Sequence, residues 1–428
     1  MKLSHIKKAH FIGVGGIGMS GLARLFLAEK KSMSGSDRAP SDITRALVTE
    51  GVIFFETQVK DNISEETDLV VYTEAMPKDH EELVRARELG IPTMNYFEAL
   101  GMVANEYYLI AVAGSHGKTT TTAMLIDIFE DAGLDPSAIV GSLRTKSKSN
   151  YRAGKSKYFI VEACEYKRDF LSLTPDVLVI TNIEHEHVDY YKNLREVQEA
   201  FRELALQVRE GGTIVLNFAD KNIAAVLEGV TAGIIDYGKF FDTTLKLSVP
   251  GVHNQLNAAA AIAAAYSVGV KPLHYRKALE GFQGTWRRFE YKGEMNGAKV
   301  YDDYGHHPTE IKATLQGARE LYPDKNITLV FQSHTYSRTH ELFNDFVEVI
   351  ASADRSIVLP IYAAREENIS GVSNVKLAGA IQEKNKNTVA MDTFDAVVQE
   401  LKGTVSDKDV VIVMGAGDVT RVASQLIE

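Results

Sequence analysis

YYLIAVAGSHGKTTTT, residues 107–122, is the stretch that decides how the middle of this chain folds. Its apolar run at residues 109–113 predicts a short buried strand. Apolar residues at helical spacing after Thr120 predict a helix to Ala132, with Gly133 as its C-terminal cap. A strand, a glycine-rich turn and a helix form the geometry that binds phosphate, because backbone N–H groups of the turn and of the helix N-terminus face the anion.

This turn departs at one position from the strict phosphate-loop pattern G-x-x-x-x-G-K-[ST], since Val112 stands where the pattern has its first glycine. We expect Lys118 to reach the outer phosphates and the Thr119 hydroxyl to bind Mg²⁺. The alternative is an ordinary turn between a strand and a helix, but the flanking elements favour a phosphate site. The expected nucleotide-binding residues are Gly114, Ser115, His116, Gly117, Lys118, Thr119 and Thr120.

Composition limits the classes of protein that this chain can be. Its 428 residues allow about two to four domains. The net charge of −10 argues against nucleic acid as the main partner. A single cysteine, Cys164, excludes an intrachain disulfide and fits a reducing compartment. No apolar run reaches about 18 residues and none near the N-terminus suits a signal peptide, so we expect no membrane span and a cytoplasmic protein.

A second glycine-rich turn lies near the N-terminus. Residues 13–18 match G-x-G-x-x-G between an expected strand at 10–14 and an expected helix at 19–30. Asp37 follows at the distance where dinucleotide-binding folds place their ribose-binding acid. NAD is the first interpretation of this motif alone, and glycines that only allow close packing are the alternative. The phosphate loop one domain later makes a plain dehydrogenase the less favoured hypothesis.

Strands and helices alternate along the whole chain, which predicts an α/β protein with parallel sheets covered by helices. We expect a Rossmann-like N-terminal domain at 1–103, a central domain with the phosphate loop at 104–285 and a Rossmann-like C-terminal domain at 286–428.

Two polar side chains are expected beside the phosphate loop. Glu162 ends an apolar strand at 158–163, and His187 follows another at 176–183. Ligands of parallel sheets bind at the carboxyl ends of strands, so both residues join Thr119 as candidate metal ligands. Mg²⁺ prefers oxygen ligands, and a histidine would also tolerate Mn²⁺. The alternatives are a carboxylate bound to a neighbouring loop and a histidine that caps a helix.

Motifs in all three blocks resemble those of the Mur ligase family. The motifs are GVGGIGMSGLA and SGSD, then AGSHGKTTT, VEACEY, TNIEHEHVDYY and GVHNQLNAAAAIA, then GTWRRFE, YDDYGHHPTEI, FQSHTYSRT, YAAREE and GAGD. YGHHPTE and GVGGIGMSG are similar to the alanine-adding branch. The resemblance implies a ligase that uses ATP and Mg²⁺ to join L-alanine to UDP-N-acetylmuramate through an acyl phosphate, in peptidoglycan precursor synthesis. It also implies a monomer or a weak homodimer.

The resemblance also assigns roles to residues. The UDP-sugar side would comprise Gly15, Gly16, Ile17, Gly18, Ser36, Asp37 and Thr73. His253, Asn254 and Asp303 would hold the adenosine of ATP. Tyr304, His306 and Arg338 would line the amino-acid side, where a cation pairs with the alanine carboxylate. Catalysis would fall to Lys118, His187, Arg288, His306 and Arg338, and the third domain would close over the site.

The chain departs from the family pattern in three places. Thr335 stands where many relatives have arginine, so Arg338 would bind the carboxylate alone. Phe201 and Arg202 stand where several Mur ligases have a carbamylated lysine, so we expect no such modification. The segment 237–250 is short, which predicts a reduced outer sheet in the middle domain. A peptide-adding ligase, an NAD-dependent oxidoreductase and a non-catalytic nucleotide-binding regulator remain as alternatives.

Overall fold

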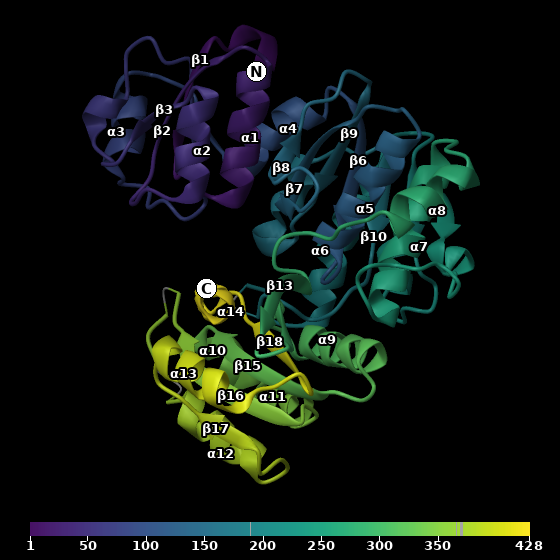
Figure 1. Cartoon of the computed structure of the whole chain (residues 1–428). Coiled ribbons are helices and arrows are strands. Elements are labelled where there is room, and N and C mark those ends of the chain that lie inside the picture. The colour runs from purple at the N-terminus through teal and green to yellow at the C-terminus, as the bar shows by residue number, and fades with distance from the viewer. Residues whose placement is uncertain (189, 365, 369–370) are drawn as a thin grey trace. The chain divides into compact units, whose positions relative to one another are not determined.

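The structure is a computed structural model that describes residues 1–188, 190–364, 366–368 and 371–428 (Figure 1). Asp189 and Arg365, which belong to the motifs TNIEHEHVDYY and YAAREE, lie outside the described residues. The chain divides into two compact units. The first comprises Met1–Leu245 and Leu256–Phe282, and the second comprises Lys246–Gln255 and Gln283–Glu428.

The first unit begins with a parallel sheet in the order β3-β2-β1-β4-β5. The elements are β1 (Lys8–Ile12), α1 (Ile17–Ala28), β2 (Ser32–Ser36), α2 (Asp42–Glu50), β3 (Ile53–Phe55), β4 (Leu69–Tyr72), α3 (Glu81–Glu88), β5 (Thr93–Asn95) and α4 (Tyr96–Ala104). The expected strand and helix around the N-terminal glycines are confirmed as β1 and α1, each displaced by about two residues. Helix α4 was not expected, although a capping box of Asn95 and Glu98 marks its start.

The second sheet of this unit has the order β12-β11-β10-β6-β9-β7-β8. Its elements are β6 (Tyr108–Ala113), α5 (Lys118–Asp131), β7 (Ser137–Arg144), β8 (Ser149–Arg152), β9 (Tyr158–Glu162), β10 (Val177–Ile180), α6 (Leu194–Leu206), β11 (Thr213–Leu216), β12 (Gly233–Asp236), α7 (Val252–Ser267) and α8 (Pro272–Glu280). Gly133 follows α5 with φ +70°, as its expected role at the helix C-terminus requires. The antiparallel hairpin of β7 and β8 was not expected.

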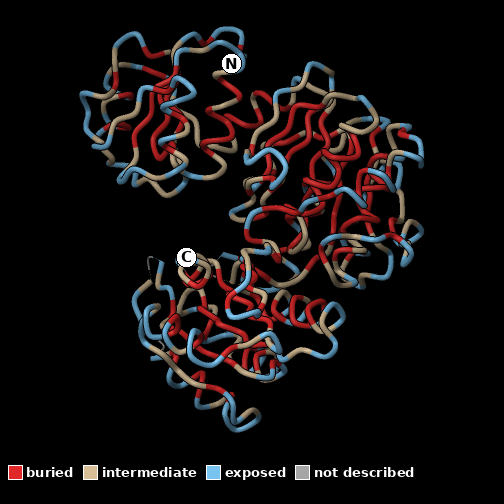
Figure 2. Tube along the Cα trace, in the orientation of Figure 1, coloured by how far each residue is buried: buried red, intermediate tan, exposed pale blue. Residues whose placement is uncertain are grey.

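One hydrophobic core continues from the first sheet into the second. Phe11 and Leu22 belong to the same buried cluster as Ile139 and Phe159, and Figure 2 draws the strands of both sheets largely as buried chain. Helix α1 packs on β7 and β8. A Cβ at Gly101 of α4 would lie 2.4 Å from the carbonyl oxygen of Ser172, so this close approach requires glycine.

The second unit contains a sheet in the order β13-β14-β18-β15-β16-β17. Its elements are β13 (Glu290–Met295), β14 (Ala298–Asp303), α9 (Pro308–Leu321), β15 (Asn326–His334), α10 (Tyr336–Glu341), α11 (Phe343–Ile350), β16 (Arg355–Tyr362), α12 (Asn374–Gln382), β17 (Thr388–Ala390), α13 (Phe394–Thr404), β18 (Asp409–Met414) and α14 (Thr420–Ile427). The expectation of a wholly parallel sheet is wrong at one edge, because β13 is antiparallel to β14. Asn296 and Gly297, both at positive φ, form the tight turn that joins them.

Two further details differ from or extend the sequence analysis. Helix α7 begins at Val252, so the motif HNQLN lies inside its first turns. Between Asp236 and Val252 the described chain forms the 3₁₀ turn Tyr237–Phe240 and no strand. In the part of the chain that the structure describes, no helix combines the length and the apolar character needed to cross a bilayer.

Candidate active site

The turn between β6 and α5 requires glycine at two positions. Gly114 has φ +133°, and a Cβ there would lie 1.9 Å from the hydroxyl oxygen of Thr181. Gly117, which caps α5, has φ +82°, and its Cβ would lie 2.2 Å from the side-chain oxygen of Asn257. Since other residues are strained at such φ values, the two glycines allow the turn to lie tightly against the end of β10 and against α7.

Asn182, which follows β10, orders two amide groups of this turn. Ser115 donates its backbone N–H to the carbonyl oxygen of Asn182 at 3.0 Å. His116 donates its backbone N–H to the side-chain oxygen of Asn182 at 2.9 Å. These two bonds hold the turn in the tight conformation in which a phosphate loop places its remaining amides near an anion.

Lys118 lies at the start of α5 and folds back over the turn. Its ammonium donates to the carbonyl oxygen of Gly114 at 2.5 Å and lies 2.9 Å from a carboxylate oxygen of Glu165. The Glu165 side chain is 1% exposed. Burial alone would lower the pKa of Lys118, but the adjacent carboxylate outweighs burial and raises it. The same pairing holds the pKa of Glu165 below its usual range against the opposing effect of burial.

The three expected metal ligands form two groups. The Thr119 hydroxyl donates to Glu162 at 2.8 Å, and Gly141 donates its backbone N–H to the same carboxylate at 2.9 Å. His187 instead lies 3.2 Å from Glu165, and ligand atoms of Glu165, Glu186 and His187 all lie within 4.8 Å of one another. Hydroxyl, carboxylate and imidazole groups at these separations fit a divalent cation.

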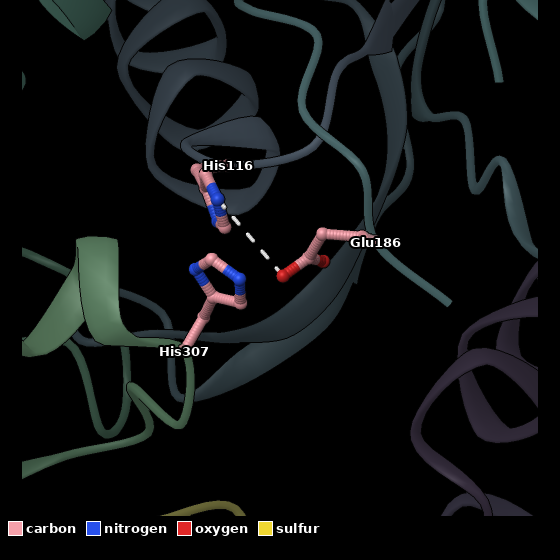
Figure 3. Close-up of side chains that lie close together, drawn as sticks. All are labelled: His116, Glu186 and His307. Atoms are coloured by element: carbon pink, nitrogen blue, oxygen red, sulfur yellow. Dashed lines mark ion pairs between the residues drawn. The ribbon is translucent and has the colours of Figure 1, made fainter. Parts of the chain in front are cut away.

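Two features support a functional role for the loop after β10. His187 has φ +53°, a conformation that non-glycine residues adopt at a cost and that is common at functional sites. Glu186 lies 3.9 Å from a ring nitrogen of His116 in the phosphate loop, and Figure 3 marks this ion pair. Glu165 and Glu186 were not expected as ligands, although each lies within three residues of an expected one.

The N-terminal glycine turn brings together most of the expected UDP-sugar residues. Gly15 donates its backbone N–H to the carboxylate of Asp37 at 2.8 Å. A Cβ at Gly13 would lie 2.7 Å from Thr73, and the backbone N–H of Gly13 bonds to the carbonyl oxygen of Ser36 at 2.8 Å. The N-terminus of α1, where Gly16 is the cap, therefore faces the carboxyl ends of β1, β2 and β4, the edge where nucleotides bind in such sheets.

In the second unit, Arg288 and His306 share one carboxylate. Arg288 lies 3.4 Å and His306 lies 3.6 Å from Glu310 of α9. The guanidinium of Arg288 also lies over the ring of Tyr304, 5.2 Å from its centroid. Arg288 and His306 thus pair with Glu310, an unexpected residue, and Tyr304 lies against Arg288.

Arg338 meets a further unexpected residue, His334, at the end of β15. A guanidinium nitrogen of Arg338 lies 3.3 Å from the Nδ1 atom of His334, whose ring stacks on Tyr362. Burial, together with the charge of Arg338, lowers the pKa of His334 to about 4. Thr335, which caps the N-terminus of α10, has φ +65°, so this strand end also carries backbone strain.

The expected adenosine-side residues all lie in the second unit, where Asn254 and Asp303 are buried and His253 is partly buried. Burial lowers the pKa of His253 to about 4, and Asn254 donates its side-chain amide to the carbonyl oxygen of Pro250 at 2.7 Å. Asp303 accepts backbone N–H groups from Phe289 at 2.8 Å and Gly305 at 2.6 Å, and burial raises its pKa to about 6. These contacts show that Asp303 also holds the turn after β14.

Comparison with known families agrees with the three sheets. Residues 8–108 match the description "Mur ligase family, catalytic domain", residues 112–242 match "Mur ligase middle domain" and residues 287–417 match "Mur ligase, glutamate ligase domain".

Among curated proteins, the chain is 42% identical to a UDP-N-acetylmuramate–L-alanine ligase of Clostridium novyi, over 99% of this chain and 97% of that protein. It is 39% identical to the enzyme of the same name from Caldanaerobacter subterraneus, over 100% and 98%. A solved UDP-N-acetylmuramate–alanine ligase from Thermotoga maritima superposes with a TM-score of 0.82 at 27% identity, covering 98% of both chains. A murein peptide ligase from Psychrobacter arcticus shares the fold, with a TM-score of 0.70 at 24% identity and 98% coverage of both chains.

Proposed function

The chain belongs to the Mur ligase family, and from this premise we propose that it uses ATP to join L-alanine to the carboxylate of UDP-N-acetylmuramate. In this reaction the sugar carboxylate attacks the γ-phosphorus of ATP, and ADP leaves. The amine of L-alanine then attacks the acyl phosphate, and phosphate leaves as the amide bond forms. The phosphate loop with Lys118 beside the Thr119–Glu162 pair carries this proposal.

The difficulty of the first step is electrostatic, because two anions must meet and negative charge spreads over the transferring phosphoryl group. Lys118 is fixed at the start of α5 and would bind the outer phosphates. Thr119 and Glu162 would hold one Mg²⁺, and Glu165, Glu186 and His187 fit a second. A bound Mg²⁺ would neutralise phosphate charge. Mn²⁺ should replace it, since an imidazole ligand suits that ion better than Mg²⁺.

The remaining roles follow the grouping within each unit. The turn at residues 13–18 with Asp37 would bind the UDP-sugar. In the C-terminal unit, Arg338 would pair with the carboxylate of L-alanine, and Arg288 would approach the γ-phosphate. The proposed domains span residues 1–103, 104–285 and 286–428. The proposed location is the cytoplasm, which suits an enzyme with one free thiol, Cys164.

Phosphate release tests this function. With ATP, Mg²⁺ and UDP-N-acetylmuramate we expect L-alanine to stimulate release far more than L-serine, glycine or a tripeptide acceptor. Preference for the tripeptide would instead assign the chain to peptide addition. Lys118→Ala should lower the rate of phosphate release about 10³-fold or more, because cations that bind the transferred phosphoryl group stabilise its transition state. Binding of NADH in place of the UDP-sugar would contradict the proposal.

A further inference from the structure

Asn150, on strand β8 of the middle sheet, makes its side-chain contacts with helix α1 of the N-terminal sheet. It is fully buried, although β8 is the edge strand of its sheet. Its amide nitrogen donates to the carbonyl oxygen of Ile17 and, at 3.1 Å, to the hydroxyl of Ser20. Its amide oxygen accepts from Arg24 at 2.7 Å. One side chain therefore uses both ends of its amide on three residues of a single helix.

The surrounding residues fit this contact closely. A Cβ at Gly21 would lie 3.1 Å from the amide nitrogen of Asn150 and 3.2 Å from a methyl group of Ile139 on β7. Glycine therefore lets α1 approach the hairpin. Arg24 is held from its other side by Glu50 of α2, at 2.8 Å. The Arg24 side chain is 11% exposed, so this ion pair is better shielded from solvent than an ordinary surface pair.

The same hairpin also touches the expected metal ligand of the phosphate site. Gly141 on β7 donates its backbone N–H to Glu162, and a Cβ at this position would lie 2.5 Å from the carboxylate. The β7–β8 hairpin thus contacts α1 through Asn150 and contacts Glu162 through Gly141. At its N-terminus, α1 carries the glycine turn that we assign to the UDP-sugar.

We propose that Asn150 is a positioning residue that fixes helix α1 on the β7–β8 hairpin, so that a sugar nucleotide bound at residues 13–18 keeps a fixed position relative to the phosphate loop. This role rests on the proposed ligase function. The two anions must meet with their reacting atoms about 3 to 3.5 Å apart, and a displacement of 1 Å can lower the rate about 100-fold. Apolar packing alone would allow α1 to slide slightly along the hairpin. Three directed hydrogen bonds to the Asn150 amide instead fix one position of the helix.

Hydrogen exchange tests the anchor in ligand-free protein, independently of any activity. In Asn150→Ala, peptides that cover residues 13–24 should exchange about tenfold faster or more than in the wild type. Lys148→Ala, at an exposed position in the turn of the same hairpin, is the matched control and should exchange like the wild type. If Asn150→Ala fails to fold, Arg24→Ala, which removes one of the three bonds, should give a smaller change of the same kind. Unchanged exchange in α1 would overturn the proposal.

Kinetics then separate positioning from binding. Asn150→Ala should lower kcat for phosphate release about 10- to 100-fold, while the Kd values for UDP-N-acetylmuramate and for ATP, each measured alone, stay within about threefold. Loss of UDP-sugar affinity in proportion to kcat would overturn the positioning role, as would wild-type kcat in a variant whose α1 exchanges faster. A wild-type protein without ligase activity would refute the proposed function, and the exchange experiment would still decide whether Asn150 anchors α1.

Discussion

Replacing Glu165 with glutamine tests how much the buried ion pair with Lys118 stabilises the ligand-free protein. Glutamine keeps the shape of the side chain and removes its charge, so the Lys118 ammonium stays buried without its counter-ion. Removing one partner of a buried pair typically costs about 3–5 kcal/mol. The carbonyl oxygens of Gly114 and Ser115 still accept from Lys118, at 2.5 and 3.1 Å. Because these bonds are retained, we expect a smaller loss of stability, about 2–3 kcal/mol.

The measurement is urea unfolding at pH 7 in the presence of EDTA, with thermal melting as a second readout. A loss of about 2 kcal/mol should lower the Tm by about 4–8 °C for a unit of this size. Glu66→Gln is the matched control, because the Glu66 side chain is 84% exposed and pairs with Lys8 at 3.2 Å. An exposed pair contributes about 0–1 kcal/mol, so this variant should melt close to the wild type.

A Glu165→Gln variant as stable as the wild type would refute this reasoning. The double variant Glu165→Gln with Lys118→Met gives an independent check. It removes the uncompensated charge that Glu165→Gln leaves behind, and replacing both members of a buried pair is often close to neutral. We therefore expect the double variant to be more stable than Glu165→Gln alone. The opposite order would mean that the ammonium is not an unfavourable buried charge.

Two further predictions concern single residues. Gly117→Ala should reduce the free energy of unfolding by about 3 kcal/mol or more, through backbone strain and the clash with Asn257. Gly133→Ala is the control, because Gly133 has φ +70° and no atom within 4 Å of its Cβ, and it should cost only about 1 kcal/mol. Equal losses in urea titrations would contradict the clash. Burial lowers the pKa of His334 from 6.5 to about 4 in the folded protein. As the pH falls from 6.5 toward 4, the unfolded chain takes up a proton at this residue and the folded protein does not. The folded protein therefore loses stability across this pH range, whereas above pH 6.5 nothing is lost. Between pH 7 and 4.5 the wild type should therefore lose about 1 kcal/mol more than His334→Gln, after allowance for solvent screening, and parallel pH profiles for the two proteins would rule out this assignment.

Sequence patterns located the elements that lie in the middle of the sheets and missed several at the edges. Strands such as β6 and β10 are continuous apolar runs because both of their faces are buried. β8, with the sequence SNYR, has no such pattern, since it lies at the edge of its sheet and its burial comes from α1. β13 was missed for a similar reason, although the Asn-Gly pair after it is a strong hairpin signal.

At the candidate site, the sequence indicated which residues gather but not how they pair. Thr119 and Glu162 meet as expected, because both lie at the carboxyl edge of one sheet. His187 pairs with Glu165 and lies near Glu186, at a positive φ that no residue pattern indicates. Glu310 and His334 were missed because each was overlooked beside a neighbour that it contacts and that had already been assigned a role.

The charge pairs at the candidate site bear on how a triphosphate would bind there. Lys118 is already neutralised by Glu165, and Glu162 already accepts from Thr119 and Gly141. Because both donors to Glu162 are neutral, this carboxylate keeps its negative charge, whereas the charges of Lys118 and Glu165 offset each other. A triphosphate alone would take Lys118 from Glu165 and leave that carboxylate buried and uncompensated, at a cost of several kcal/mol. A divalent cation would remove this cost, because it would pair with Glu165 in place of Lys118. We therefore expect nucleotide affinity to depend on a divalent cation through Glu165, a residue outside the expected ligand set.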